Sequence, residues 1–173
     1  MTVLGPKVTG STVGNSLFLG AAQIRRNSTI SIFNSIIAGW PKGLIIDASK
    51  GVPTDLNITG TTPSLFVQNN VIAGCNEPLV YAASTTSPTG ANNASISGWF
   101  NTPAFSNAIL TNNEETGLTA AFNYTSPDFS PAANSAVVTG AVYTNSKLAG
   151  LQQVSYRGAS AAGDTWWRGW TRY

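Results

Sequence analysis

The chain has 173 residues, of which 42% are hydrophobic and 9% are charged, and its net charge is +2. This length suits one domain with a useful core, and the hydrophobic fraction excludes a disordered chain. The basic residues form no sustained patch, which argues against binding to nucleic acid. Charge is scarce against roughly 25% in ordinary globular proteins, which favours an extracellular or cell-surface protein over a cytosolic enzyme.

The first residues, 1–6, show neither the basic region nor the long apolar core of a signal peptide, and no apolar run of the chain is long enough to cross a bilayer. The first residues resemble the middle of a solenoid coil and not its beginning, so we expect a mature domain or a fragment. An uncapped first coil exposes unpaired backbone groups, which form a template for another chain. We therefore predict a homo-oligomer or a filament that assembles through this end.

From residue 29 onward the sequence predicts short β-strands separated by turns rich in glycine and proline. The predicted strands lie at 29–37, 43–46, 56–59, 65–67, 71–73 and 79–82. The turns lie at 39–43, 50–53, 60–63 and 74–78. Short strands with frequent turns are typical of a solenoid, a barrel or a sandwich.

Two similar segments favour the solenoid. The sequence NSIIAG at 34–39 returns as NNVIAG at 69–74, displaced by 35 positions. A repeat of this size is typical of stacked units, in which each unit covers its neighbours. A coil of about 22 residues and a loop of about 13, placed within 48–63, would fill the spacing. We predict an all-β fold, a right-handed parallel β-helix (solenoid) forming one domain over 1–173, with a β-sandwich as the alternative.

Residues 84–113 differ in character from the rest and predict an insertion that leaves the solenoid or lies across its side. A polar loop at 84–93 comes first. A short helix follows it, with Thr102 as the N-cap and Pro103 as the first helical residue.

The last third of the chain carries a resemblance to a known family. SPAANSA at 130–136, the pattern VxYxGA at 154–159 and WxxGWT at 166–171 resemble the endings of secreted right-handed parallel β-helix surface proteins from bacteria with type IX secretion. Residues 22–28 and 31–35 resemble the coils that precede this ending. The resemblance runs from about residue 21 to 171, with a poor match in the insertion. It implies the fold and secretion, and it implies no catalytic residue. The coils and the C-terminal sorting domain that flank this region in the family are absent from the sequence.

The aromatic tail, 151–173, predicts a C-terminal cap, because a solenoid must cover its last coil and large aromatic side chains do so efficiently. The same side chains suggest a second role. The faces of Trp166, Trp167 and Trp170 suit contact with the rings of a carbohydrate.

The carboxylates give only weak signs of chemistry. Asp47 lies near Lys50 and Asp55, and Glu77 lies one repeat further along, so Asp47 and Glu77 are candidate glycan contacts on one face. The alternative is a purely structural role, in which both are loop carboxylates that are solvated or cap turns. The chain has no histidine and a single cysteine, Cys75, which favours a small buried side chain over a nucleophile. We predict no catalytic residue, no cofactor and no metal site.

Two classes of function remain open on the sequence. The first is a non-enzymatic structural or adhesive surface protein that works by shape and self-assembly. The second is a carbohydrate-binding or polysaccharide-cleaving β-helix protein. A groove lined by Asp47, Glu77 and exposed tryptophans favours the second class.

Overall fold

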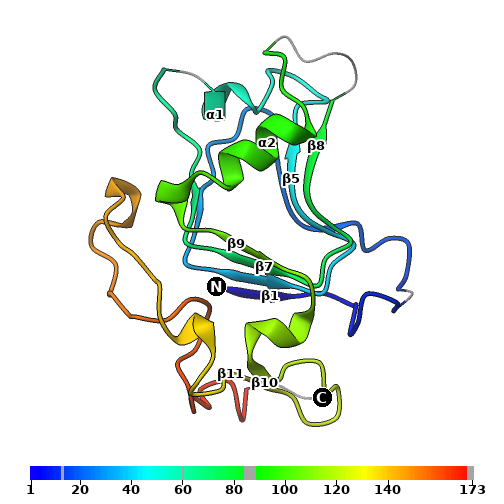
Figure 1. Ribbon diagram of the computed structural model, residues 1–173, viewed down its shortest axis with the longest axis vertical. Coiled ribbons are helices and arrows are strands. Elements are labelled where there is room, and N and C mark those ends of the chain that lie inside the picture. Colours follow the sequence, from blue (N-terminus) through cyan, green and yellow to red (C-terminus); the bar gives the residue numbers. More distant parts are fainter. Residues whose placement is uncertain (13, 60, 84–88, 171–173) are drawn as a thin grey trace.

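The computed structural model describes residues 1–12, 14–59, 61–83 and 89–170 (Figure 1). Most of its regular structure is short β-strands. They are β1 (Thr2–Leu4), β2 (Gly20–Arg25), β3 (Ile32–Phe33), β4 (Ile36–Ala38), β5 (Lys42–Asp47), β6 (Val67–Gln68), β7 (Val71–Ala73), β8 (Glu77–Ala82), β9 (Ala108–Leu110), β10 (Leu118–Ala120) and β11 (Asp128–Pro131). The α-helices are α1 (Leu56–Thr59) and α2 (Asn93–Phe100), and single 3₁₀ turns lie at Pro103–Phe105, Asn113–Thr116, Ala136–Val138 and Ser146–Leu148.

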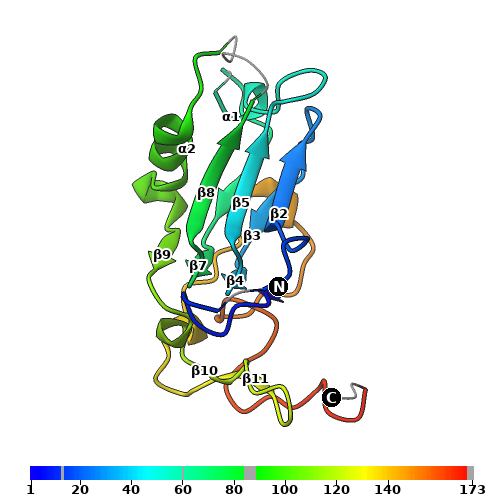
Figure 2. The same ribbon diagram turned by 90° about the vertical axis from the view of Figure 1, so that its right-hand side faces the viewer.

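Strands β1 to β9 form three parallel sheets. Their orders are β1-β4-β7-β9 in the four-stranded sheet, β2-β5-β8 in the three-stranded sheet and β3-β6 in the two-stranded sheet. Successive strands along the chain belong to different sheets, and each strand pairs with a strand of the next coil. Figure 2 shows β2, β5 and β8 side by side. Among the strands that the structure describes, only β10 and β11 pair antiparallel. Stacked parallel pairing does not fit the alternative of a sandwich, whose sheets are antiparallel.

The 35-residue repeat is confirmed as a stacking register. Ile36 pairs with Val71, 35 positions further on, whereas Gly20 pairs with Lys42, 22 positions further on. The difference of 13 residues lies between β5 and β6, within the region where the sequence predicted an extra loop. The predicted coil length and the place of the extra loop are therefore both confirmed. Residues 56–59, predicted as a strand, form α1 instead, so that strand prediction is wrong.

The repeated segments bound their strands with residues in the left-handed region. In one coil Asn34 has φ 50° and Gly39 has φ 72°, and in the next Asn69 and Gly74 both have φ 58°. Asparagine and glycine adopt this conformation at the lowest cost. The spacing of these residues therefore sets where the chain turns into and out of β4 and β7.

A ladder of polar groups, buried at Ser35 and Asn70 and half-buried at Asn107, holds the coils in register. The Ser35 N–H donates to Asn70 Oδ1 at 2.9 Å, and the Asn70 N–H donates to Asn107 Oδ1 at 2.9 Å. The side-chain amides then donate to strand carbonyls, Asn70 Nδ2 to Ile32 at 2.9 Å and Asn107 Nδ2 to Val67 at 2.7 Å. Each amide thus joins two coils, because it satisfies backbone groups at a corner where the strand ladders are interrupted.

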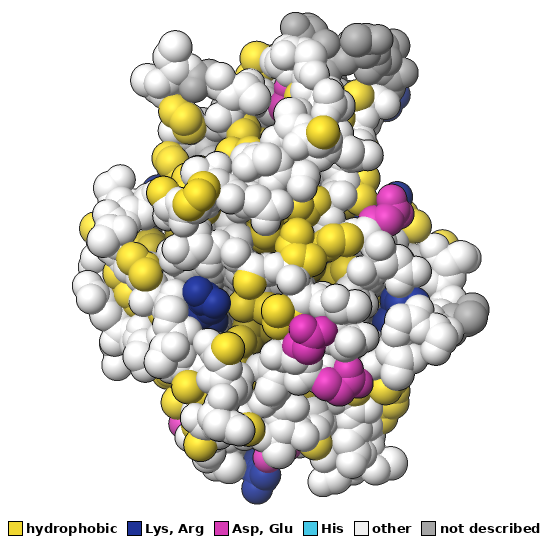
Figure 3. All heavy atoms as spheres, viewed as in Figure 1, with side chains coloured by type: hydrophobic (Ala, Val, Ile, Leu, Met, Phe, Trp, Pro, Cys, Tyr) yellow, Lys and Arg dark blue, Asp and Glu magenta, His cyan; other side chains and the backbone are white. Residues whose placement is uncertain are grey.

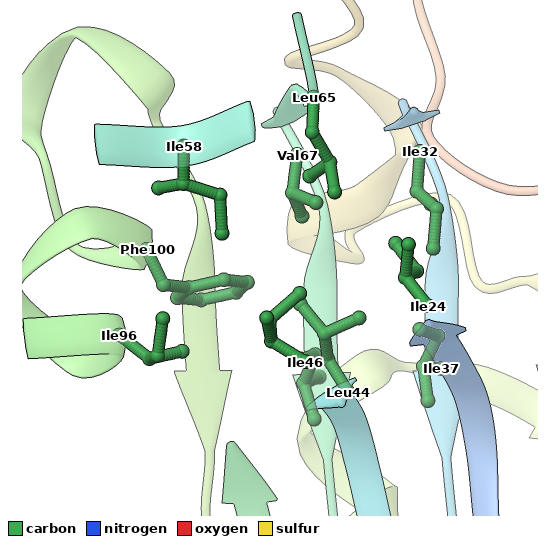
Figure 4. Packing of buried hydrophobic residues seen from close by; sticks show 11 residues of the cluster. Ile24, Ile32, Ile37, Leu44, Ile46, Ile58, Leu65, Val67, Ile96 and Phe100 are labelled. Carbon is green, nitrogen blue, oxygen red and sulfur yellow. The ribbon is translucent and has the colours of Figure 1, made fainter. Parts of the chain in front are cut away.

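The main core lies between the three parallel sheets (Figure 4). Side chains alternate along each strand, so every second residue points inward. The buried cluster consists of Ile24, Ile32, Ile37, Leu44, Ile46, Ile58, Leu65, Val67, Ile72, Ile96 and Phe100. Two of these residues, Ile96 and Phe100, come from α2, and Figure 4 shows them directed towards the strand residues. The helix therefore covers one end of the stack.

The segment 84–113 takes part in the stack rather than only leaving it. Residues 84–88 of the predicted polar loop lie outside the described residues. Asn92 and Ser95 form a capping box that starts α2, and Pro103 opens a single 3₁₀ turn at the predicted helix position. The chain then returns as β9, where Ala108 pairs with Val71.

Segments between residues 118 and 170 cover the outer faces of the four-stranded and the two-stranded parallel sheets. Val137 packs on Ile36 and Val71 in a second, smaller buried cluster. Asn34 Nδ2 donates to the Val142 carbonyl and Asn34 Oδ1 accepts from the Val142 N–H, both at 3.0 Å. Lys147 Nζ donates to backbone carbonyls on the side of β3 and β6. Strand β4 is consequently buried on both faces.

Candidate functional site

The C-terminal aromatic side chains form one cluster. Trp167 is 3% exposed and makes edge-to-face contacts with Phe129 and Trp166, with ring centroids 5.5 and 5.9 Å apart. The Trp166 Nε1–H donates to the Ala159 carbonyl at 3.2 Å. Trp170, by contrast, is 88% exposed. The cluster thus has a buried base and an exposed rim.

Two hydrogen bonds donated by backbone N–H groups place this cluster beside β1 and the corner before β4. The Gly158 N–H donates to the Asn34 carbonyl at 2.8 Å, and the Ala159 N–H donates to Thr2 Oγ1 at 3.0 Å. Gly158 has φ 95°, and a Cβ there would lie 2.7 Å from Thr2 Oγ1. Only glycine allows this approach without strain.

A pocket of about 340 Å³ lies between the aromatic cluster and β1. Its lining is mostly apolar and consists of Thr2, Leu4, Phe129, Ala159, Ser160, Trp166, Trp167 and Trp170. The segment 151–173, predicted to cap the last coil, therefore places its tryptophans next to the first coil. The sequence predicted that the tail would cap the opposite end of the stack. That end is covered instead by the apolar face of α2.

Strand β1 forms an edge of the four-stranded sheet and exposes backbone groups next to this pocket. The Met1 carbonyl accepts from Ile36 N–H at 2.9 Å, and the Gly5 N–H donates to the Ala38 carbonyl at 2.8 Å. Alternate residues of a parallel strand bond to opposite sides, so the backbone groups of Thr2 and Leu4 point away from β4. Sequence reasoning predicted an open first coil but did not identify these residues, since a three-residue strand carries too little pattern.

Asp47 is a buried structural carboxylate at the end of β5. It is 3% exposed and accepts from Gln23 Nε2 at 2.6 Å and from the Ser49 N–H at 2.8 Å, and Arg25 Nε lies 3.4 Å away. Burial raises the pKa of this carboxyl, but the hydrogen bonds from Ser49 and Gln23 and the charge of Arg25 outweigh burial and hold its pKa below the usual value. A carboxylate that stays ionised in this way does not suit general acid catalysis at neutral pH.

Glu77 lies at the other end of the three-stranded sheet. It pairs with Lys42, with 3.7 Å between Nζ and Oε1, whereas Asp47 pairs with Ala82. The two positions are five residues apart along the strands, a distance of roughly 16 Å. The paired carboxyl groups of glycoside hydrolases lie only about 5–9.5 Å apart. The structure therefore brings the three tryptophans together but leaves Asp47 and Glu77 apart from each other and absent from the pocket lining.

We expect the Asp47→Asn variant to lose stability at neutral pH and to lose less of it in acid. A carboxyl whose pKa is depressed by folding stabilises the protein above its unfolded pKa, and this contribution falls as the pH drops below about 4. The loss at pH 7 should be about 1.5–3 kcal/mol, as for hydrogen bonds to a charged group. Urea unfolding of both proteins over a pH series measures the difference. The exposed Glu114→Gln serves as control, and a difference that is independent of pH would contradict the assignment.

The structure offers no sign of other chemistry among the described residues. No three side chains of His, Cys, Asp or Glu gather there as metal ligands would. Cys75 is half-buried and has no disulfide partner, and burial raises the pKa of its thiol. Within the same part of the chain, no helix has the length and apolar character needed to cross a membrane.

Comparisons with known proteins found no relative. No family model matches the chain, and no match was found among curated proteins or among solved structures.

Proposed function

We propose that this chain is a non-enzymatic structural or adhesive protein of the cell surface or extracellular space, built as a right-handed parallel β-helix, that self-associates through the ends of its coils. The right hand follows from the general rule that crossovers between parallel strands are right-handed. The low content of charge and the resemblance of the C-terminal third to secreted bacterial β-helix proteins support the location.

The observation that carries the proposal is the open edge at the first coil. Strands β1, β2 and β3 all lie at edges of their sheets, and they belong to the same coil. Proteins usually blunt such edges with charge, proline or a covering segment. Here the residues just before β2, namely Leu17, Phe18 and Leu19, are apolar and exposed. An edge that is both unpaired and apolar favours association over solubility as a monomer.

Sedimentation velocity at micromolar concentration tests the proposal. We expect assembled species for the wild-type protein and mostly monomer for Leu4→Pro, because proline removes the outward-facing Leu4 N–H and leaves the bonds between β1 and β4 in place. The control Leu4→Ala removes the same side chain but keeps the N–H, so it should assemble. A wild-type protein that sediments only as monomer would refute self-association.

Carbohydrate binding is a second candidate function. The exposed faces of Trp166 and Trp170 beside the pocket favour it. Quenching of tryptophan fluorescence by a polysaccharide, lost in Trp170→Ala, would support this function.

A further inference from the structure

The two edges of the four-stranded sheet have matching patterns of unpaired backbone groups. At one edge, the Thr2 and Leu4 groups point outward, as described above. At the other edge, the Ala108 N–H donates to the Asn70 carbonyl at 2.8 Å and the Gly74 N–H donates to the Leu110 carbonyl at 3.2 Å. By the same alternation, the N–H and C=O of Ile109 point away from β7.

The interior side chains of this sheet also continue to both edges. Register pairs Val3 with Ile37, Ile37 with Ile72 and Ile72 with Ile109, which forms one inward-facing row. The last member, Ile109, is 40% exposed. Figure 3 shows the end of the stack that carries β9 and α2, and apolar side chains gather there between these two elements. The core is thus not fully covered at the β9 edge.

We propose that β9 of one copy pairs in parallel with β1 of a second copy, with Ile109 opposite the second copy's Val3. This inference rests on the proposed self-association and specifies its partner and register. The Ile109 N–H donates to the Thr2 carbonyl, and the Leu4 N–H donates to the Ile109 carbonyl. The hydrogen-bond phase then repeats that of the three existing strand pairs in the sheet, and the inward row continues from Ile109 into Val3 without a change of face.

The same register accounts for the pocket beside β1. When Ile109 lies opposite Val3, the flanking Ala108 and Leu110 lie opposite Thr2 and Leu4. These four side chains share the outer face, and Thr2 and Leu4 line the aromatic pocket. In the addition of a strand to a sheet edge, main-chain bonds supply affinity and pockets for alternate side chains supply specificity. The incoming Leu110 is the side chain that meets the pocket.

Disulfide trapping between two single-cysteine proteins tests the register. Val3→Cys and Ile109→Cys are each made in the Cys75→Ala background, mixed and oxidised under mild conditions. Directly opposed residues of neighbouring strands lie about 5 Å apart, within the range that a disulfide spans. We expect a cross-linked heterodimer to be the main product on a non-reducing gel.

The matched control replaces Ile109→Cys with Leu110→Cys, whose side chain points to the opposite face and should not cross-link to residue 3. Assemblies that form in sedimentation without a 3–109 cross-link would overturn the register and leave self-association standing. A dominant 3–3 product would show a head-to-head arrangement and also overturn it. A wild-type protein that is only monomeric refutes the function and the register together.

A second pair of variants tests the β9 edge without cysteines. Ile109→Pro removes an N–H that takes no part in pairing with β7, whereas Ile109→Val keeps it. We expect the proline variant to sediment mainly as monomer and the valine variant to assemble, with circular dichroism confirming that both are folded. Assembly of a folded Ile109→Pro protein would exclude β9 as the docking edge. The strand edge of β1 would then be occupied by another segment of a longer chain or by a different surface of a second copy.

Discussion

Replacement of Asn70 by alanine is expected to lower the free energy of unfolding by about 3–5 kcal/mol, because it leaves several buried polar groups unpaired at about 1–3 kcal/mol each. Asn70 is almost fully buried and bonds to three groups in neighbouring coils. It accepts from the Ser35 N–H and donates to the Ile32 carbonyl and, at 3.3 Å, to Asn107 Oδ1. No other described group is shown to bond to the Ser35 N–H in its place.

Urea unfolding followed by circular dichroism measures this loss. The control is Asn15→Ala, since Asn15 is exposed and bonds only locally, with Oδ1 accepting from the Leu17 N–H at 2.8 Å. Exposed substitutions of this kind usually change stability by about 0.5 kcal/mol or less, apart from the local bond. Equal, small effects of the two variants would show that water replaces the ladder and that the ladder does not hold the coils in register.

Truncation of Phe100 to alanine should cost a similar amount, about 3–5 kcal/mol, because it removes a buried aromatic ring and leaves a cavity. The ring is fully buried and comes from the end of α2, where it contacts the strand residues of the core (Figure 4). The loss should be accompanied by greater exposure of the core, since α2 covers one end of the stack.

Phe18→Ala is the matched control for this variant, because Phe18 is 47% exposed and packs edge-to-face on Trp40. Thermal and urea unfolding of both variants should separate them by at least about 2 kcal/mol. Binding of a hydrophobic dye should increase for Phe100→Ala and not for Phe18→Ala. If the two variants unfold alike, α2 does not close the core.

The architecture followed from the sequence because its information is local and repeated. Each copy of the repeat places asparagine and glycine at two corners and a short apolar run between them. Those residue types have left-handed and extended preferences of their own, so the register of Ile36 with Val71 could be predicted without knowledge of long-range contacts. The site was less accessible to sequence reasoning. Asp47 and Glu77 are 30 residues apart in sequence, and only the pairing of Lys42 with Glu77 shows that they lie at opposite ends of a sheet.

The sequence by itself thus determined the coil length and the place of the extra loop, since each depends on the preferences of neighbouring residues. The tertiary structure alone decided which elements meet: α2 over the end of the core, the tryptophans beside β1, and the outward-facing groups of Thr2 and Ile109 at two edges of one sheet. These depend on burial between segments far apart in the chain, where many pairings are compatible with the same local pattern and packing selects one of them.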